Sequence, residues 1–320
     1  MVRPFELLGH SAYEATEYIR DGSLYSPELC PCGSKRRSRS CHSSPSGNWI
    51  IPPSTALLRG PSTGHSHPKC FGSASNDCSP KISREHWLSA NIQESLVSDA
   101  GPAILSGAPW LKGQSKAISP NALASKILCE RHNSALSRLD SIAGDVFRAV
   151  RSMQESLAAE EAGAPPLTDH FLLVNGQYLE LWLLKLFLGG VAASAFGASG
   201  VPLSAVREKE DAIPLHEILW RGAPWPERWG MYSTDHPIDP TGNSNSVGIG
   251  THTVQDQVWG GTVQFGALHL NLALGSPDGN VIVRPGMFRF ARPSITSKEK
   301  IVAVAWPEAG HAPIEYIRQD

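Results

Sequence analysis

The positions of the cysteines constrain this chain more than any other feature. All six lie in the N-terminal part of the sequence, at Cys30, Cys32, Cys41, Cys70, Cys78 and Cys129. Two histidines accompany them, since His42 directly follows Cys41 and His132 lies three positions after Cys129. Three thiolates and one imidazole are enough to close a tetrahedral zinc site. These eight side chains make two complete ligand sets, so we expect two structural zinc ions per chain.

Composition limits the class of protein and the compartment. With 320 residues, 41% of them hydrophobic, the chain can build a core and is not wholly disordered. The net charge of −2 excludes a globally basic nucleic-acid coat, so contact with a polyanion would need a local patch. Residues Met1 to Glu14 contain no apolar run of the kind found in export signals. We therefore expect a cytoplasmic protein, where clustered cysteines bind metal more often than they form disulfides.

One apolar stretch, Leu179–Val201, raises the question of a membrane span. It contains Glu180 and Lys185, and its uninterrupted part is short and rich in small residues. A span needs about 20 strongly apolar residues. The stretch instead favours a buried helix, and we expect no membrane association.

Changes in amino-acid composition and pattern along the chain divide it into four parts. Residues 1–42 read as a leader with a small zinc knuckle, and 43–68 as a linker rich in Ser, Pro and Gly. Residues 69–163 form a second zinc unit, and 164–320 a helix followed by a β-rich domain. The predicted class is α+β, with a zinc knuckle, a zinc domain of treble-clef or ββα type and a β-rich C-terminal domain.

Periodicity predicts the main elements. The second zinc unit ends in a strong helix, with a cap at Asn133 or Ser134 and a stop at Gly163. Its apolar face recurs every three or four residues, at Leu136, Leu139, Ala143, Val146, Phe147, Val150, Met153 and Leu157. A second helix is predicted at 177–188. Strands are predicted at 262–274, 281–283, 287–290 and 300–306. In the first of these the alternation slips near Gly266–Leu268, which indicates a β-bulge.

The first ligand set lies in the string CPCGSKRRSRSCH, residues 30–42. Gly33 permits a tight turn that lets Cys30 and Cys32 face one ion. This string resembles the SEC-C zinc motif, and the resemblance implies a small module that recruits a partner. Four cations lie within it, Lys35, Arg36, Arg37 and Arg39. They could contact a phosphate backbone without reading sequence, or they could be a solvated charged loop.

The second ligand set spans a longer stretch. Cys70 and Cys78 form one pair, and Cys129 and His132 form the other just before the strong helix. A loop that supplies one pair and a helix start that supplies the other are typical of a treble-clef or ββα unit. Glu85-His86 lies between the pairs, and Asn133 follows the last ligand. With these residues, 69–148 resembles the HNH, or ββα-metal, family of nucleases.

The resemblance implies a metal-dependent endonuclease, a hydrolase of nucleic-acid phosphodiesters. His86 would be the general base, because an imidazole with a pKa of ~6.5 can deprotonate water near neutral pH. Glu85 and Asn133 would hold a catalytic Mg2+ or Mn2+. Adjacent strand residues point to opposite faces, however, so Glu85 and His86 share a site only where the strand ends or bends. The competing hypothesis is a non-catalytic zinc module that recognises nucleic acid or protein. The choice of DNA or RNA, the oligomeric state and the role of residues 164–320 stay open.

Overall fold

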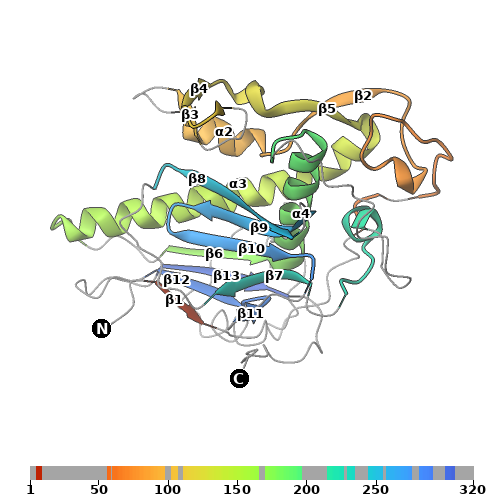
Figure 1. The fold of residues 1–320 in the computed structure, drawn as a ribbon. Helices are drawn as coiled ribbons and strands as arrows, with labels where there is room; N and C mark the ends of the chain where they lie inside the picture. The colour runs from red at the N-terminus through yellow and green to blue at the C-terminus, as the bar shows by residue number, and fades with distance from the viewer. Residues whose placement is uncertain are drawn as a thin grey trace.

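The computed structural model describes most of the chain from residue 56 onward. The described residues are 5–8, 56–58, 60–97, 102–106, 111–165, 170–196, 215–226, 229–234, 244–254, 257–275, 281–290 and 300–306. They combine long helices with several sheets, so the predicted α+β class is confirmed. Figure 1 shows three levels: a small unit that holds β2 to β5, the long helix α3 beneath it, and two larger sheets at the bottom.

The β-rich C-terminal region is confirmed and contains two sheets. The five-stranded sheet is antiparallel, in the order β11-β7-β10-β9-β8. Its strands are β7 (Gly230–Thr234), β8 (Val247–Val254), β9 (Gln257–Phe265), β10 (Leu268–Ala273) and β11 (Val281–Val283). The four-stranded sheet has the order β1-β12-β13-β6, and β13 runs parallel to β6. Its strands are β1 (Phe5–Leu8), β6 (His170–Asn175), β12 (Met287–Phe290) and β13 (Lys300–Ala305).

A hairpin turn between two of these strands stands where a β-bulge was predicted. Residues 262–274 are the end of β9 and the whole of β10, joined by a tight turn at Gly266 and Ala267. Leu268 pairs with Phe265 directly across this turn. Gly266 has φ +54°, in the left-handed region that favours glycine in hairpin turns. The predicted bulge was wrong, because a two-residue turn shifts the alternation just as an extra strand residue would.

The upper unit consists of two short antiparallel pairs and a short helix. One pair is β2 (Ile82–His86) with β5 (Ala124–Cys129), and the other is β3 (Ala103–Leu105) with β4 (Lys116–Ile118). Helix α2 (Ala90–Leu96) follows β2 and precedes β3 in the chain. Strand β5 leads straight into α3, while α2, β3 and β4 lie between β2 and β5 in the chain.

Helix α3 (Glu130–Glu161) is the predicted strong helix, and it begins earlier than expected. Its apolar stripe is buried along its length, and Gly163 follows its end with φ +91°. The predicted cap at Asn133 or Ser134 was wrong, because the N-cap is Cys129 at the end of β5. The first helical N–H groups find partners outside the helix: that of Glu130 donates to the Lys81 carbonyl (2.9 Å). The region of the predicted metal ligands therefore caps the helix.

Helix α4 (Gly176–Ala192) is the predicted second helix and is buried on nearly all sides. It packs against α3 and against strands of both larger sheets. Leu181, Trp182 and Phe187 are among the side chains it places in a continuous hydrophobic core. This core includes residues from both sides of the predicted 163/164 boundary. None of the described helices is long and apolar enough to cross a membrane.

Candidate metal centre

Four side chains of the second ligand set converge at the junction of β5 and α3. Cys70, Cys78, Cys129 and His132 are all buried, and one ligand atom from each lies within 4.8 Å of the others. The Nδ1 atom of His132 lies 3.6, 3.7 and 3.1 Å from the sulfurs of Cys70, Cys78 and Cys129. A tetrahedral zinc ion would separate a sulfur from a nitrogen ligand by about 3.6 Å. The predicted cluster is therefore assembled with spacing that can hold a metal ion such as zinc.

The histidine is held in the form that a metal requires. Burial lowers the pKa of His132 to about 4, so its ring is neutral at pH 7. Its Nε2 lies 3.1 Å from the Ser75 hydroxyl, which itself donates to the Gly72 carbonyl (2.7 Å). The Ser75 oxygen therefore accepts the Nε2 proton, and the lone pair of Nδ1 faces the three sulfurs. Such a partner behind a ligating histidine fixes its tautomer and ring orientation.

Backbone N–H groups point at the sulfurs. Burial raises the pKa of Cys70 and Cys78, while hydrogen bonds from nearby backbone N–H groups oppose the rise. At Cys129 burial acts in the same direction, but hydrogen bonds from the backbone of His132 and Ser79 outweigh it and lower the pKa. Donors aimed at sulfur stabilise the thiolate, which is the form that binds metal.

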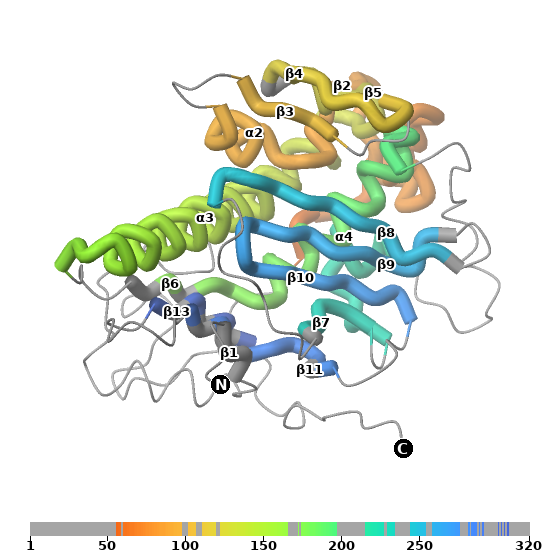
Figure 2. Tube along the Cα trace, turned by 60° about the vertical axis from the view of Figure 1, so that its left-hand side comes forward, coloured from red at the N-terminus to blue at the C-terminus, as the bar shows by residue number. Residues whose placement is uncertain are grey.

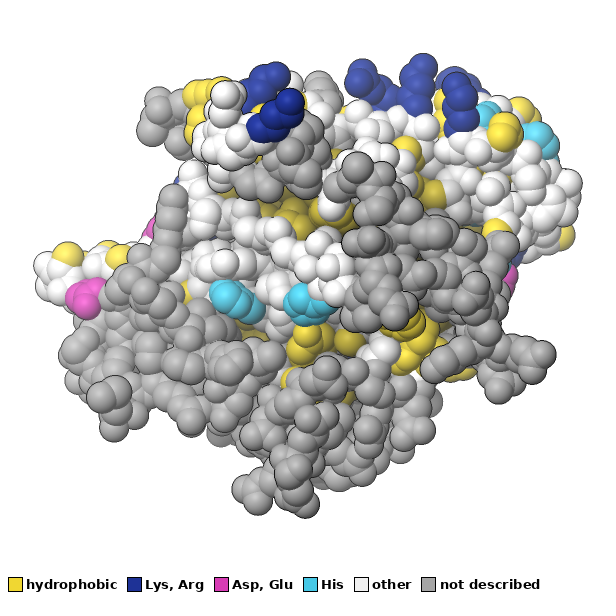
Figure 3. Space-filling view, viewed as in Figure 1, with side chains coloured by type: hydrophobic (Ala, Val, Ile, Leu, Met, Phe, Trp, Pro, Cys, Tyr) yellow, Lys and Arg dark blue, Asp and Glu magenta, His cyan; other side chains and the backbone are white. Residues whose placement is uncertain are grey.

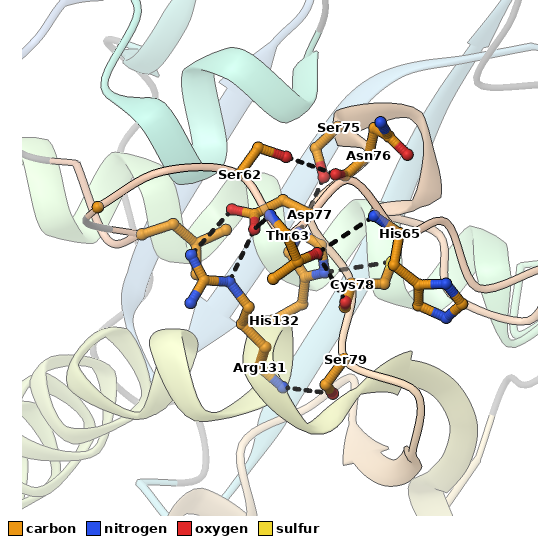
Figure 4. A network of polar contacts seen from close by, with 12 residues as sticks. Ser62, Thr63, His65, Ser75, Asn76, Asp77, Cys78, Ser79, Arg131 and His132 are labelled. Carbon is orange, nitrogen blue, oxygen red and sulfur yellow. Dashed lines mark hydrogen bonds and ion pairs between the residues drawn. The ribbon is translucent and has the colours of Figure 1, made fainter.

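A buried carboxylate joins the two halves of the ligand set. Asp77 precedes Cys78, and Arg131 lies between Cys129 and His132, so their ion pair links the two ligand pairs directly (Nε–Oδ1 2.9 Å). The Thr63 backbone N–H also donates to Asp77 (2.9 Å). Figure 4 shows these contacts around the centre. Burial alone would raise the pKa of Asp77, but its hydrogen bonds and the neighbouring guanidinium groups hold the pKa below the ordinary value.

A distant segment covers the centre. Arg221, at the end of the π-helical turn Glu217–Arg221, forms a second ion pair with Asp77 (2.5 Å). The neighbouring Trp220 packs edge-on against the His132 ring, with 4.5 Å between the ring centroids. Gly72 lies under both rings, since a Cβ there would come within 3.0 Å of Trp220 and 3.1 Å of His132. The metal centre is therefore part of the main core and does not stand as a separate knuckle.

The other predicted ligands and phosphate contacts lie outside the described residues. Both the first ligand set and the basic residues beside it fall there: Cys30, Cys32, Cys41, His42, Lys35, Arg36, Arg37 and Arg39. A metal ion at the first ligand set and these phosphate contacts stay predictions.

Glu85, a predicted ligand of a catalytic ion, points into the core. Its carboxylate lies 2.6 Å from Lys185 Nζ of α4, and both side chains are almost fully buried. Lys185 also contacts Asp140 (2.8 Å) and donates to the His86 carbonyl (2.7 Å). Burial raises the pKa of Glu85 to about 7, although the Lys185 charge acts against the rise. In this structure the carboxylate belongs to a buried ion network.

His86 ends β2, and Asn133 of α3 contacts the same strand. His86 is the last residue of the strand and is half-buried, and its Nε2 has no hydrogen-bond partner among the described residues. The Asn133 amide donates to the Ser83 hydroxyl (2.9 Å) and to the Arg84 carbonyl (3.0 Å), so it ties α3 to β2. A bulge between Ser83 and Glu85 bends the strand here. The assignment of Glu85, His86 and Asn133 as catalytic residues stays a prediction.

Several residues that build the centre were missed by the sequence reasoning. Around the ligand cluster they are Ser75, Asp77, Arg131, Trp220 and Arg221, and beside Glu85 the missed residue is Lys185. Asp77 and Arg131 carried a signal, because each lies directly beside a cysteine or histidine ligand. Trp220, Arg221 and Lys185 carried none, because their contacts join positions far apart in the chain.

Comparisons with family models, curated proteins and solved structures find no match to this chain.

Proposed function

We propose that the unit around β2, β5 and the start of α3 is a zinc-stabilised module that binds nucleic acid through its phosphate backbone. Zinc is the ion that three thiolates and one imidazole suit best, and a closed four-ligand set is typical of a structural site. The ion would hold the strand pair, the loop before β2 and the first turn of α3 in one arrangement.

The observation that carries the proposal is the charge of this unit. Among described residues 60–130, the exposed basic side chains are Lys69, Lys81, Arg84, Lys112, Lys116 and Lys126. The exposed carboxylates of the same residues are Glu94 and Glu130, and Glu130 already pairs with Lys81 (2.6 Å). Figure 3 shows Lys and Arg side chains gathered over this unit at the top of the molecule, with no acidic side chain among them. A local basic surface on a chain of net charge −2 is a footprint for a polyanion.

Two of these residues lie together on the strand pair. Arg84 is at the bulge of β2, and the neighbouring register pairs, Ser83 with Leu128 and Glu85 with Ser125, leave Lys126 and Ile127 opposite it. Arg84 and Lys126 are both exposed and form no ion pair among the described residues. They are the pair that we expect to contact adjacent phosphates.

Replacing Arg84 and Lys126 together by Gln should weaken binding to a short labelled DNA duplex or RNA. Each of the two lost phosphate contacts should reduce the slope of log K against log salt by about 0.9 on duplex DNA, or about 1.8 in all. Fluorescence anisotropy at several salt concentrations measures both the affinity and the slope. Arg148→Gln is the matched control, because Arg148 is also exposed but pairs with Asp145 farther along α3. An equal effect of the control, or no binding by the wild-type protein at low salt, would contradict the proposal.

A second candidate function, a metal-dependent nuclease, is favoured by one observation. His86 ends β2 with its Nε2 unpartnered among the described residues, which leaves this nitrogen available as a base; the atom is buried, so water and phosphate would reach it only if the site opened. In this hypothesis Asn133, with Glu85 if it leaves Lys185, would hold Mg2+ or Mn2+.

His86→Ala should then lower cleavage of plasmid DNA or of RNA by at least about a hundredfold, because a general base contributes about 10²–10⁴ to the rate. Zinc content and binding should be nearly unchanged, since a base acts on the transition state. His65→Ala, at an exposed position, is the control. The absence of cleavage by the wild-type protein with Mg2+ or Mn2+ would exclude the nuclease and leave the binding module.

A further inference from the structure

The segment that covers the candidate metal centre is anchored in the main core. It is the π-helical turn Glu217–Arg221, in which Ile218, Leu219 and Trp220 are almost fully buried. The turn packs against α4, and in both backbone views it lies below the unit that holds β2 to β5 (Figure 1, Figure 2). It ends at Gly222, whose φ of +73° lies in the left-handed region that favours glycine. The core therefore fixes the position of this covering segment.

A second stretch of chain fastens the covering segment. The backbone N–H groups of Leu57 and Leu58 both donate to the Trp220 carbonyl (2.9 and 3.0 Å). The Nη1 atom of Arg221 donates to the Gly60 carbonyl (3.3 Å). Trp220 and Arg221 can therefore move away from the centre only if several hydrogen bonds break together.

The covering segment restrains the ring of His132. Trp220 lies edge-on against this ring, Gly72 lies close to it, and the Ser75 hydroxyl accepts from its Nε2. Beside three thiolates the neutral imidazole is the ligand that can leave a metal ion at the lowest electrostatic cost. Its ring can turn away only if one of its three neighbours moves. Of these, Trp220 alone comes from outside the ligand loop, residues 70–78.

The covering segment also restrains a second ligand. The Arg221 guanidinium pairs with the fully buried carboxylate of Asp77, which directly precedes the ligand Cys78. Asp77 has another ion pair, with Arg131 (2.9 Å). Loss of Arg221 would therefore loosen the ligand loop without leaving Asp77 as a buried carboxylate that has no cation.

We propose that Trp220 and Arg221 are positioning residues that set the rate at which the centre exchanges its metal ion. A site with four protein ligands is closed, so exchange requires one ligand to leave before a competing small thiol or carboxylate chelator can bind. While the covering segment is in place, His132 stays on the ion and the three buried cysteines stay out of reach of the competitor. The proposal rests on zinc binding at the centre and does not depend on nucleic-acid binding.

The test measures zinc release from full-length protein that carries Cys41→Ser, which removes the ion predicted for the first ligand set. Excess EDTA captures the released zinc, and mass spectrometry after rapid gel filtration gives the zinc that remains bound. Arg221→Gln should raise the release rate about tenfold or more, because a hydrogen-bonded ion pair with a buried carboxylate is lost. Arg284→Gln is the matched control, since it removes a pair of closely similar burial with Glu180 of α4, and it should leave the rate unchanged.

A pair of tryptophan variants tests the contact with His132. Trp220→Ala should raise the release rate at least as much as Arg221→Gln does. Trp220→Phe should release zinc nearly as slowly as the reference protein, because it keeps an aromatic ring beside the imidazole. In the reference protein the rate should not depend on the EDTA concentration, because displacement of the covering segment limits it. In Trp220→Ala the rate should rise with EDTA concentration, because the chelator then reaches the ion directly.

The equilibrium affinity separates positioning from a general loss of structure. The covering segment slows binding and release alike, so the zinc affinity, measured by competition with a chelator, should change much less than the rate. An affinity that falls by the same factor as the rate rises would overturn the proposal. So would equal acceleration by Arg284→Gln, or rates that neither Arg221→Gln nor Trp220→Ala changes.

The outcomes also separate this proposal from the zinc assignment. A reference protein without zinc at the centre would overturn both, whereas bound zinc with unchanged release rates would overturn only the role of the covering segment. Circular dichroism of the zinc-loaded proteins checks that each variant is folded. If Trp220→Ala is not folded, Arg221→Gln and its control decide the test.

Discussion

Replacing Cys129 by Ser should lower the zinc content by one ion per chain and unfold the region around the centre. Cys129 belongs to the candidate metal centre and is also the N-cap of α3, so its loss opens the site at the point where strand and helix meet. Structural zinc contributes about 10–16 kcal/mol in small zinc-binding peptides. A whole domain is stable by only about 5–15 kcal/mol. We therefore expect a large fall in the melting temperature, measured by calorimetry, together with zinc loss measured by mass spectrometry.

Cys41→Ser is the matched control for this experiment. It should remove the ion predicted for the first ligand set, so its zinc content should also fall by one. The main unfolding transition should stay nearly unchanged, because the second set, at the core, is intact. A Cys129→Ser protein that keeps both its zinc and its melting temperature would contradict the assignment of the centre. A wild-type protein with one zinc ion, which Cys129→Ser removes, would contradict only the predicted site at the first ligand set.

Replacing Lys185 by Met should destabilise the protein by about 3–5 kcal/mol, the usual cost of removing one partner of a buried ion pair. The substitution leaves Glu85 and Asp140 in the core without their cation. Lys185 also donates to the His86 carbonyl, so β2 loses its link to α4. Urea unfolding of the zinc-loaded protein measures the change in the free energy of unfolding.

Two further variants sharpen this test. Adding Glu85→Gln to Lys185→Met should recover part of the loss, because one of the two orphaned carboxylates is then neutral. Arg148→Met breaks the exposed pair with Asp145 and should change the stability by less than about 1 kcal/mol. Equal effects of Lys185→Met and Arg148→Met would show that the buried network does not stabilise the fold.

Much of the fold could be predicted from short-range patterns. The recurrence of apolar residues from Leu136 to Leu157 predicted α3, because a helix places such positions on one face whatever surrounds it. The alternation in residues 262–274 predicted strands, but it could not distinguish a bulge from a hairpin turn. Both shift the pattern by the same amount, and only the pairing of Leu268 with Phe265 separates them.

The candidate site, too, could be predicted only in part. The spacing of Cys70, Cys78, Cys129 and His132 predicted the ligand set, because metal ligands are few in kind and their short-range spacing is characteristic. The pairing of Glu85 with Lys185 was not predictable, because any of the many charged residues could have been its partner. Glu85 and His86 are adjacent in the sequence. Nothing in the sequence showed which of the two side chains would point to the core.

The sequence by itself therefore determined the α+β class, the two main helices and the four residues of the candidate metal centre. Each depends on residues near one another in the chain or on a side-chain chemistry that few residues share. Only the tertiary structure decided what surrounds the ligands and what faces solvent. Arg221 reaches Asp77 from 144 positions away, and Trp220 beside it packs against the ring of His132. Contacts of this kind form only when the whole core packs together, and no local pattern in the sequence predicts them.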